Sequence, residues 1–267
     1  MSRAETSGRR TALVTGASSG IGLELARLLA EDGCDLVVVA RSGQKLEEMA
    51  RDFGHRYDVS VRPHAVDLSE PGVARALWSE LEGEGVSIDI LVNNAGVGLY
   101  GPLWEQAPDA LDRMVELNVV ALTSLTRQAL PGMQKRRWGR ILNVASVVGY
   151  QPGGPRMAAY YATKSYVLSF SKGLACELRG TGVSVTVVCP GLTKTPFEEK
   201  AGVQQTVLYR WVPAMAPDAV ARAAYRGLKR QSRVVIPGLM AKLLAVAGEL
   251  PPRGIALEVN RRLLQRA

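Results

Sequence analysis

Short, continuous apolar runs alternate along the chain with stretches whose apolar residues recur at helical spacing. The run Asp35–Ala40, which reads Leu-Val-Val-Val-Ala after its first residue, is too continuous for anything but a strand buried on both faces. Together the apolar runs predict seven strands, at 11–15, 35–40, 60–66, 88–92, 140–145, 183–189 and 233–236. Strands that alternate with helices at this spacing predict an α/β fold, with a doubly wound parallel sheet and helices on both of its faces.

The intervening amphipathic stretches supply these helices. Their apolar spacing predicts helices at 23–31, 44–53, 112–134 and 217–230, and a further helix that carries Tyr160 and ends near Arg179. Asn118 lies inside the third of them. Because Asn is an indifferent helix former, we expect its side chain to be buried, hydrogen-bonded and able to interrupt the helix locally.

No linker or internal repeat divides the chain, so we expect one domain with distinct ends. Residues 1–10 are polar and predict a flexible leader, and residues 11–237 form the single domain. Within the domain, residues 193–217 follow a strand end with irregular periodicity and large apolar groups, namely Phe197, Val203, Leu208, Trp211 and Met215. This segment is either a lid over an apolar substrate or a surface excursion with a small cluster of its own.

Residues 238–267 form a C-terminal tail that predicts two short helical stretches. The tail is basic as well as apolar, and it carries Arg253, Arg261, Arg262 and Arg266. Such a tail lies on a membrane surface as a peripheral contact, against a partner subunit, or on its own domain. The three alternatives stay open at this stage.

Composition narrows the function classes. The 267 residues are 47% hydrophobic and 22% charged, with a net charge of +8, as in a soluble protein with a sizeable core. The Lys and Arg residues are scattered apart from Lys135-Arg136-Arg137, which argues against nucleic acid and suits a phosphate-rich cofactor. Three distant cysteines and two isolated histidines predict neither disulfides nor a metal site. Without a signal peptide or an apolar run of membrane-spanning length, we expect a cytoplasmic protein.

A glycine-rich turn links the first strand to the first helix. Gly16, Gly20 and Gly22 have the spacing G-x-x-x-G-x-G, and free backbone N–H groups converge with the positive helix dipole at such a turn. A strand, a turn and a helix N-terminus in this order predict a pyrophosphate cradle, whose other candidate residues are Ser18, Ser19 and Ile21. The alternative is a plain strand-to-helix turn.

The end of the second strand discriminates between cofactors. An acidic residue there would hydrogen-bond the adenosine ribose diol, whereas an Arg can pair with a 2′-phosphate. The chain has Arg41 at this point, and Asp35 stands at the opposite end of the strand. The sequence therefore favours NADP(H) over NAD(H), with a solvated loop arginine as the alternative.

Polar residues also follow the third and fourth strands. Asp67 caps the next helix or meets an adenine amino group, and Leu68 follows it. Asn94, Ala95 and Gly96 follow the fourth strand, where an amide can tie down backbone or contact a ribose. We assign all five to the cofactor site.

The segment Tyr160-Tyr161-Ala-Thr-Lys164 has the pattern of a proton-transfer device. Tyr160 and Lys164 are four residues apart and so share one face of a helix. A phenol titrates near pH 10, and a neighbouring ammonium lowers that pKa at about 1.4 kcal/mol per unit. Ser146 follows the fifth strand, and the loop 149–155 can bring its hydroxyl to the phenol. Taken without the other motifs, the Tyr160–Lys164 spacing has an alternative interpretation, a half-buried Tyr beside a solvated Lys.

Taken together, these motifs resemble the short-chain dehydrogenase/reductase family in its compact single-domain form, with a Rossmann-type fold. The resemblance covers roughly residues 11–229 and rests on Thr15-Gly16-x3-Gly20-x-Gly22, Asp67, Asn93-Asn94-Ala95-Gly96, Asn118, Ser146, Tyr160-x3-Lys164, and Pro190-Gly191 with Thr195. It implies hydride exchange between the nicotinamide and a carbonyl or alcohol carbon, on a fairly apolar small molecule.

The resemblance also implies a role for each residue. Tyr160 would be the general acid in reduction and the base in oxidation, while Ser146 would hydrogen-bond the substrate oxygen. Lys164 would hold the nicotinamide ribose and lower the phenol pKa, and Asn118 would anchor a water in a proton relay. Pro190, Gly191 and Thr195 would support the nicotinamide.

The chain departs from the family pattern in three places. The interval from Ser146 to Tyr160 is one residue longer, with Gly153-Gly154 as the insertion, and Tyr161 competes with Tyr160 because it also can face Lys164. The chain also lacks the short glycine-rich finish of tetrameric members, so we expect a homodimer or another homo-oligomer. The alternative function is a dinucleotide-sensing binding protein without turnover, which would tolerate loss of Ser146, Tyr160 or Lys164.

Overall fold

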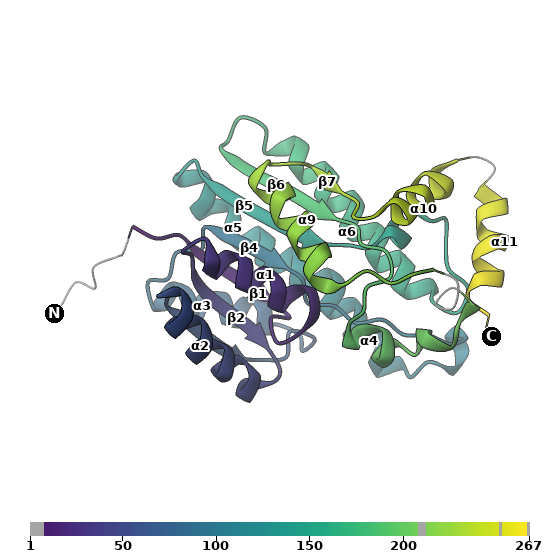
Figure 1. The fold of residues 1–267 in the computed structure, drawn as a ribbon, viewed down its shortest axis with the longest axis horizontal. Helices are drawn as coiled ribbons and strands as arrows, with labels where there is room; N and C mark the ends of the chain where they lie inside the picture. Colours follow the sequence, from purple (N-terminus) through teal and green to yellow (C-terminus); the bar gives the residue numbers. More distant parts are fainter. Residues whose placement is uncertain (1–7, 208–211, 251–252, 266–267) are drawn as a thin grey trace.

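The computed structural model of the protein describes residues 8–207, 212–250 and 253–265. Most of the predicted leader, Leu208 and Trp211 of the predicted lid, and Arg266 of the tail lie outside the described residues. Figure 1 shows a central sheet with helices packed on it and two further helices at one end.

Within the described residues, seven parallel strands form one sheet in the order β3-β2-β1-β4-β5-β6-β7. The strands are β1 Thr11–Thr15, β2 Asp35–Ala40, β3 Val61–Ala65, β4 Ile90–Asn93, β5 Gly139–Val144, β6 Val183–Val188 and β7 Val234–Val235. This order confirms the predicted doubly wound fold. The chain turns outward in opposite directions from the neighbours β1 and β4, and ligands bind at such a switch point.

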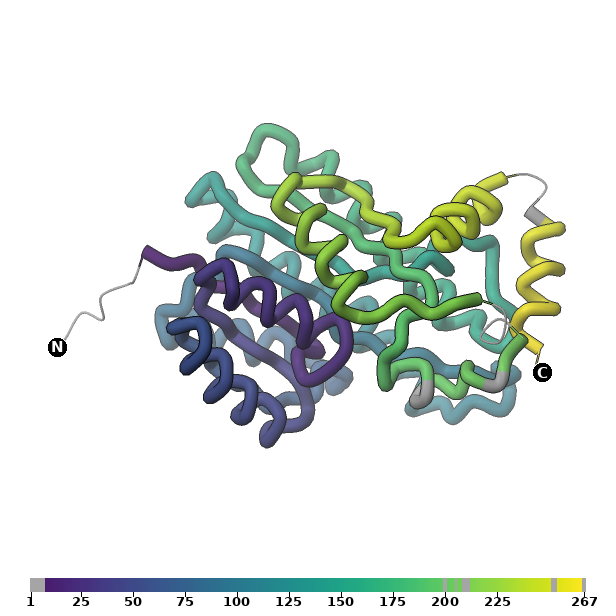
Figure 2. The backbone as a smooth tube through the Cα atoms, in the orientation of Figure 1, coloured from purple at the N-terminus to yellow at the C-terminus, as the bar shows by residue number. Residues whose placement is uncertain are grey.

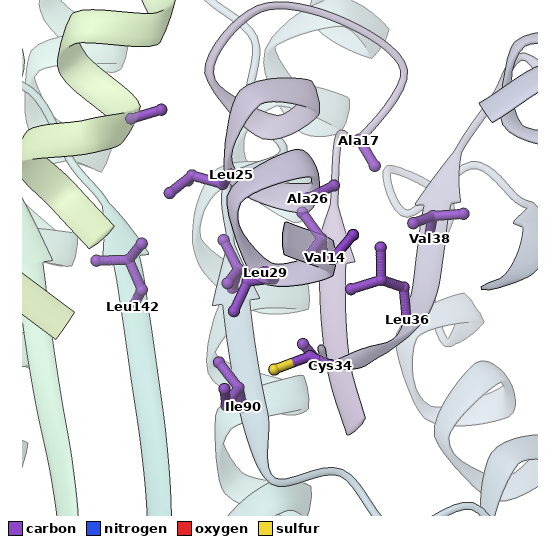
Figure 3. Packing of buried hydrophobic residues seen from close by; sticks show 14 of the residues in the cluster. Val14, Ala17, Leu25, Ala26, Leu29, Cys34, Leu36, Val38, Ile90 and Leu142 are labelled. Atoms are coloured by element: carbon purple, nitrogen blue, oxygen red, sulfur yellow. The ribbon is translucent and has the colours of Figure 1, made fainter. Parts of the chain in front are cut away.

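Helices cover both faces of the sheet. They are α1 Gly20–Glu31, α2 Gly43–Tyr57, α3 Val73–Gly83, α4 Pro108–Val115, α5 Leu122–Lys135, α6 Ala158–Glu177, α7 Pro196–Ala201, α9 Pro217–Lys229, α10 Leu239–Glu249 and α11 Arg253–Leu263. Strand residues alternate between two cores, one closed by α1, α2 and α9 and the other by α3, α5 and α6. Figure 3 shows Leu25 and Leu29 of α1 and Val14 of β1 among the side chains of the first core.

The predicted continuous helix at 112–134 is wrong in detail. The chain forms α4, then a π-helical segment at Glu116–Ala121, and then α5. Asn118 lies in the π segment and is 1% exposed, with its side chain bonded to the backbone of Val97. The widened turn is the local interruption expected for a buried Asn, because its side-chain bonds hold it out of regular α-helical geometry.

The tail packs on its own domain. Its first helix, α10, joins a small cluster with Val147, and Gln151 Nε2 donates to Leu244 O at 2.6 Å. Its end is tied down by Tyr100, whose hydroxyl donates to Leu264 O at 2.6 Å, and by Val207 N, which donates to Gln265 O at 3.1 Å. In Figure 2 the end of the yellow tail reaches the green segment that follows β6. The division of the chain into leader, domain and tail stays a prediction.

Among the described helices, none combines the length and the apolar character that crossing a bilayer requires.

Candidate active site

A cavity of about 810 Å³ opens at the carboxyl ends of the strands. Most of the predicted site residues line it: Gly16, Ser18, Ser19, Gly20, Ile21, Arg41, Asp67, Leu68, Asn94, Ala95, Gly96, Ser146, Tyr160, Lys164, Pro190, Gly191 and Thr195. Gly22 and Asn118 are not in its wall. The structure therefore brings the ends of six strands, β1 to β6, to one cavity, and two predicted residues support it from behind.

The glycine-rich turn is held against the end of β4 by a compact network. Thr15 Oγ1 accepts the backbone N–H groups of Asn94 and Ala95, both at 3.0 Å. Asn94 Nδ2 donates in return to Thr15 O at 2.9 Å and to Gly16 O at 3.2 Å. A Cβ at Gly22 would lie 2.3 Å from Asn94 Nδ2, so this position has room only for hydrogen. Gly22 thus lets α1 approach the turn and leaves its N-terminus facing the cavity.

The opposite end of the cradle carries positive charge. Arg41, on the cavity wall, has Nη1 3.9 Å from Asp67 Oδ2. Lys45, in the first turn of α2, lines the same part of the cavity and was missed by the sequence reasoning. The sequence signal that could have identified Lys45 is its position as a second cation, four residues or about one helical turn after Arg41.

Asp67 does not cap the following helix, so that alternative is wrong. The helix α3 begins at Val73 with Gly72 as its N-cap. The Asp67 carboxylate instead accepts from Ser69 N at 3.0 Å and from Ser69 Oγ at 2.7 Å. Burial raises the pKa of Asp67, but hydrogen bonds from Ser69 and the nearby guanidinium of Arg41 outweigh it and hold the pKa below its ordinary value. The adenine contact stays a prediction.

Ser146, Tyr160 and Lys164 meet at the centre of the cavity. Tyr160 is 8% exposed and hydrogen-bonded to Ser146, which stands at the end of β5. Lys164 is 5% exposed, with Nζ 3.0 Å from Val144 O and 5.9 Å from the centre of the Tyr160 ring. The packing separates the two tyrosines, because Tyr161 faces Gly154 rather than Ser146. This geometry favours Tyr160 as the phenol of the site.

The expected lowering of the phenol pKa by Lys164 is not found. Burial raises the pKa of Tyr160, and the hydrogen bond with Ser146 only partly opposes this effect. Burial also lowers the pKa of Lys164 to about 8. The ammonium bonds to a carbonyl instead of the phenol oxygen, which explains why its influence on the phenol is weak.

Asn118 supports the site from behind. Its Oδ1 accepts from Val97 N at 3.0 Å, and its Nδ2 donates to Val97 O at 2.8 Å and to Thr163 Oγ1 at 3.1 Å. These bonds fix the loop after β4 against α6. Gly96 lies directly over Asn118 and Lys164, since a Cβ at this glycine would be 3.2 Å from Asn118 Oδ1 and 3.4 Å from Lys164 Nζ.

The turn after β6 closes the part of the cavity beside Ser146. Pro190 O accepts from Val147 N at 2.8 Å and from Ser146 Oγ at 3.4 Å. Thr195 reaches across to the glycine-rich turn, where a Cβ at Gly20 would be 2.9 Å from its methyl group. The segments that follow β1 and β6 therefore meet over one cleft.

The wall of the cavity formed by the predicted lid and the tail, which we call the substrate side, contains Phe197 and Val203 of that lid together with residues that the sequence reasoning did not name. Phe197, in the predicted lid, packs on Tyr160 with ring centres 5.5 Å apart. Other cavity residues come from the lid and from the tail: Pro196, Glu198, Val203, Thr206, Val212, Leu244, Asn260, Leu263 and Leu264. Their sequence neighbourhood carries no motif, so only the fold brings them to the site.

The residues present fit a nicotinamide dinucleotide. The turn at Gly20 has a φ of +58° and the cleft beside Gly96 is tight for a Cβ, and the absence of side chains at both positions leaves backbone amides open to a phosphate and a ribose. Positive charge from Arg41 and Lys45 lies at one end and the Ser146–Tyr160 pair at the other. In the described part of the chain, His, Cys, Asp and Glu nowhere form a group of three that could hold a metal ion.

Comparison with known proteins agrees with this geometry. The short chain dehydrogenase family model matches residues 10–206. D-beta-hydroxybutyrate dehydrogenase of Cupriavidus necator is 35% identical over 191 residues, which are 72% of this chain and 73% of that protein.

Solved structures of related enzymes have the same fold. A short-chain dehydrogenase from Sphingobium yanoikuyae in complex with NADPH is 35% identical, with a TM-score of 0.80 over 97% of this chain and 98% of that one. The bulky-bulky ketone specific alcohol dehydrogenase from Comamonas testosteroni is 33% identical, with a TM-score of 0.75 over 87% and 88% of the two chains. By its sequence match, its sheet order and its relatives, this chain belongs to the short-chain dehydrogenase family.

Proposed function

We propose that the protein is an NADP(H)-dependent oxidoreductase that interconverts a carbonyl and a secondary alcohol on a fairly apolar small molecule. The observation that carries this proposal is the meeting of the Ser146 and Tyr160 hydroxyls on the cavity wall beside Lys164. A hydroxyl and a phenol in contact can hold one substrate oxygen between them.

Two cations support the choice of NADP(H). Arg41 and Lys45 face the same end of the cavity, where a 2′-phosphate would gain charge-assisted hydrogen bonds. The carboxylate nearby, on Asp67, is engaged by Ser69 and lies beside Arg41. The Sphingobium yanoikuyae relative, which holds NADPH, supports the same choice.

The lining of the substrate side supports an apolar substrate. Phe197, Val203, Leu244, Leu263 and Leu264 all face the cavity. Apolar surface of this kind favours a bulky hydrocarbon frame over a small polar one. The preference of the Comamonas testosteroni relative for bulky-bulky ketones is consistent with such a substrate.

In the proposed mechanism the bound nicotinamide supplies or accepts a hydride at the substrate carbon. Ser146 orients the substrate oxygen toward Tyr160. In reduction the Tyr160 phenol donates its proton to that oxygen, and in oxidation the phenolate takes the proton back. Because burial raises the pKa of Tyr160, the phenol is protonated at neutral pH, which suits the reductive direction.

Supporting residues hold this geometry. Lys164 would bind the nicotinamide ribose, and its charge would stabilise the phenolate that follows proton transfer. Asn118 fixes Val97 and Thr163 on either side of the reacting groups. The proton lost from Tyr160 returns from solvent, with Asn118 as the proposed anchor of the relay. A homo-oligomeric state and a membrane contact of the tail stay predictions.

The test is a panel of ketones of graded size, from cyclohexanone to 4-phenylcyclohexanone, with NADPH or NADH absorbance as the readout. We expect turnover to rise with ketone size and to prefer NADPH. The Tyr160→Phe variant should lose activity by about 10³-fold, within the range for removal of a general acid. The matched Tyr161→Phe variant should retain activity on these ketones.

Two outcomes would count against the proposal. Full activity of Tyr160→Phe would remove the phenol from the mechanism. Tight NADPH binding by the wild type without turnover of any ketone or alcohol would instead favour the dinucleotide-sensing binding protein.

A further inference from the structure

The substrate side of the cavity contains a second pair of polar oxygens, apart from Ser146 and Tyr160. They belong to Tyr161 on α6 and Asn260 on α11. The two side chains are nine-tenths or more buried, at 4% and 7% exposure, and both line the cavity. Buried polar groups are ordinarily hydrogen-bonded, so each of these oxygens needs a partner.

Tyr161 is held by packing alone. Its ring meets that of Tyr160 edge to face, with centres 6.5 Å apart and an interplanar angle of 75°. On the other side it lies against Gly154, where an added Cβ would be 2.4 Å from two of its ring carbons. Across the described part of the chain, its hydroxyl has no hydrogen-bond partner, in contrast to those of Tyr100 and Tyr166.

Asn260 has an amide whose orientation is fixed by its neighbours. Its Nδ2 donates to Gly153 O at 2.8 Å and to Gln151 Oε1 at 3.3 Å. The Gln151 amide is fixed in turn, because its Nε2 donates to Leu244 O. The carbonyl oxygen of Asn260 therefore points away from this bridge, and no described residue donates a hydrogen bond to it.

The two side chains share one corner of the cavity. Asn260 bonds to Gly153, and Tyr161 packs on the adjacent Gly154. Neither oxygen is fully enclosed by protein atoms. The described side-chain polar atoms that are both fully enclosed and without a hydrogen-bond partner belong to other residues: Asn93, Gln106, Gln128, Ser184 and Thr186. The oxygens are therefore open to whatever fills the cavity, next to the apolar side chains of Met157, Leu263 and Leu264.

We propose that Tyr161 and Asn260 form a second polar subsite, which binds a neutral hydroxyl group of the substrate remote from the reacting carbonyl. The Tyr161 phenol donates a hydrogen bond to that hydroxyl, and the Asn260 carbonyl accepts one from it. A carboxylate does not fit, because it would meet the Asn260 carbonyl oxygen without a proton between them. This inference rests on the proposed function and narrows its substrate class to hydroxylated ketones and the corresponding diols.

The subsite follows from the energetics of buried oxygens. In the free protein, solvent in the cavity can satisfy both groups. A wholly apolar substrate that displaces this solvent leaves each oxygen unpaired, at a cost of about 1–3 kcal/mol per group. A substrate with a hydroxyl at this point avoids that cost, so the cavity selects for it.

The test compares matched ketones with and without a remote hydroxyl. The pairs are 4-(4-hydroxyphenyl)cyclohexanone with 4-phenylcyclohexanone, and 4-(4-hydroxyphenyl)butan-2-one with 4-phenylbutan-2-one, which differ in reach and flexibility. Their affinities are measured at equilibrium on the NADPH-loaded Tyr160→Phe variant, and kcat/KM is measured on the wild type. We expect at least one hydroxylated ketone to be favoured about tenfold over its partner in both measurements.

Variants of the protein then test which residues cause the preference for the hydroxylated ketone. Adding Tyr161→Phe should reduce the tenfold ratio to within about twofold, because the hydroxylated ketone loses a hydrogen bond and the unhydroxylated ketone no longer leaves the phenol oxygen unpaired. Tyr166→Phe, which removes a phenol oxygen from the exposed side of the same helix, is the matched control and should keep the ratio. Asn260→Ala should lower the ratio more than Gln151→Ala, because Gln151→Ala breaks the amide bridge but keeps the Asn260 carbonyl oxygen.

The readouts separate this inference from the proposed function. A binding preference that Tyr161→Phe abolishes supports the subsite even if the wild type turns over no ketone, in which case only the proposed reaction fails. Equal affinity for the members of both pairs, or no binding of any member, overturns the subsite. An equal loss for both members in Tyr161→Phe also overturns it, because that residue would then shape the cavity without recognising a hydroxyl.

Discussion

The cofactor side and the substrate side of the cavity are built in different ways. On the cofactor side, Thr15, Asn94 and the glycine-rich turn connect the ends of neighbouring strands through hydrogen bonds between side chains and backbone. On the substrate side, Phe197 of the segment after β6 and Leu264 of the tail belong to one apolar cluster, and Leu244 of the tail packs in a neighbouring one with Val147. A phosphate cradle needs fixed backbone donors, whereas a wall around a hydrocarbon needs only shape and apolar surface.

This contrast suggests that the two sides can be altered separately. Changes on the cofactor side should affect NADP(H) affinity with little effect on ketone selection. Changes in the tail should affect ketone selection with little effect on NADP(H) affinity. The Tyr160 phenol lies between the two sides, and its removal should affect turnover alone.

The largest separable effect is expected at Arg41. Arg41→Ala should weaken NADPH binding by about 30-fold, because a charge-assisted hydrogen bond to a 2′-phosphate is lost, while NADH binding changes less than twofold. Fluorescence titration of both cofactors measures this directly. The control is Arg9→Ala, which removes an exposed Arg that pairs with Asp58 away from the cavity. Equal weakening of NADPH and NADH would remove Arg41 from phosphate recognition.

Gly22 tests whether the cradle depends on close packing. The methyl group of Gly22→Ala would collide with Asn94 Nδ2 and Gly16 O, so we expect a loss of about 2 kcal/mol in unfolding free energy and about tenfold weaker NADPH binding. Gly173→Ala, in a helical position with open space around it, should leave NADPH binding unchanged and should leave the unfolding free energy unchanged or raise it slightly. Denaturant titration with and without NADPH provides the measurement. Similar behaviour of the two variants would contradict the close approach.

Leu264 tests the substrate side. This side chain is 2% exposed and lines the cavity, so Leu264→Ala should raise KM for 4-phenylcyclohexanone by about tenfold while the NADPH dissociation constant stays within twofold. Leu243→Ala, at a position 56% exposed on α10, is the control and should leave both constants unchanged. Steady-state kinetics and cofactor titration are compared on the same preparations. If NADPH affinity fell as much as ketone affinity, the two sides would not be separable.

Lys164 provides a smaller, pH-dependent signature. Its pKa falls from 10.5 to about 8 on folding, so between these values the unfolded state binds more protons than the folded state. Stability should therefore rise with pH in this window, by about 2 kcal/mol between pH 8 and 9.5 for the cofactor-free protein. The rise should be absent in Lys164→Met. Chemical denaturation at each pH measures it, and an identical profile for both proteins would contradict the lowered pKa.

The predictability of the two sides follows from the same contrast. The strands, the glycine-rich turn and the Tyr160-x3-Lys164 pair depend on local sequence, so apolar runs and residue spacing are enough to locate them. The Asp67 cap was predicted wrongly because its partner, Ser69, is nearer than the start of the next helix. Asn260 and Leu264 could not have been found, since no local pattern shows that a tail residue returns to Gly153 and Tyr100.

The central claim, that a hydride from the cofactor and a proton from Tyr160 reduce a ketone, is tested most directly by single-turnover transfer of deuterium. NADPH deuterated at C4 of the nicotinamide is bound to the wild type and to Tyr160→Phe, and 4-phenylcyclohexanone is added. We predict that deuterium appears on the carbinol carbon with the wild type, and about 10³-fold more slowly with the variant at equal NADPH occupancy. Equal rates of deuterium transfer in the two proteins would contradict the account.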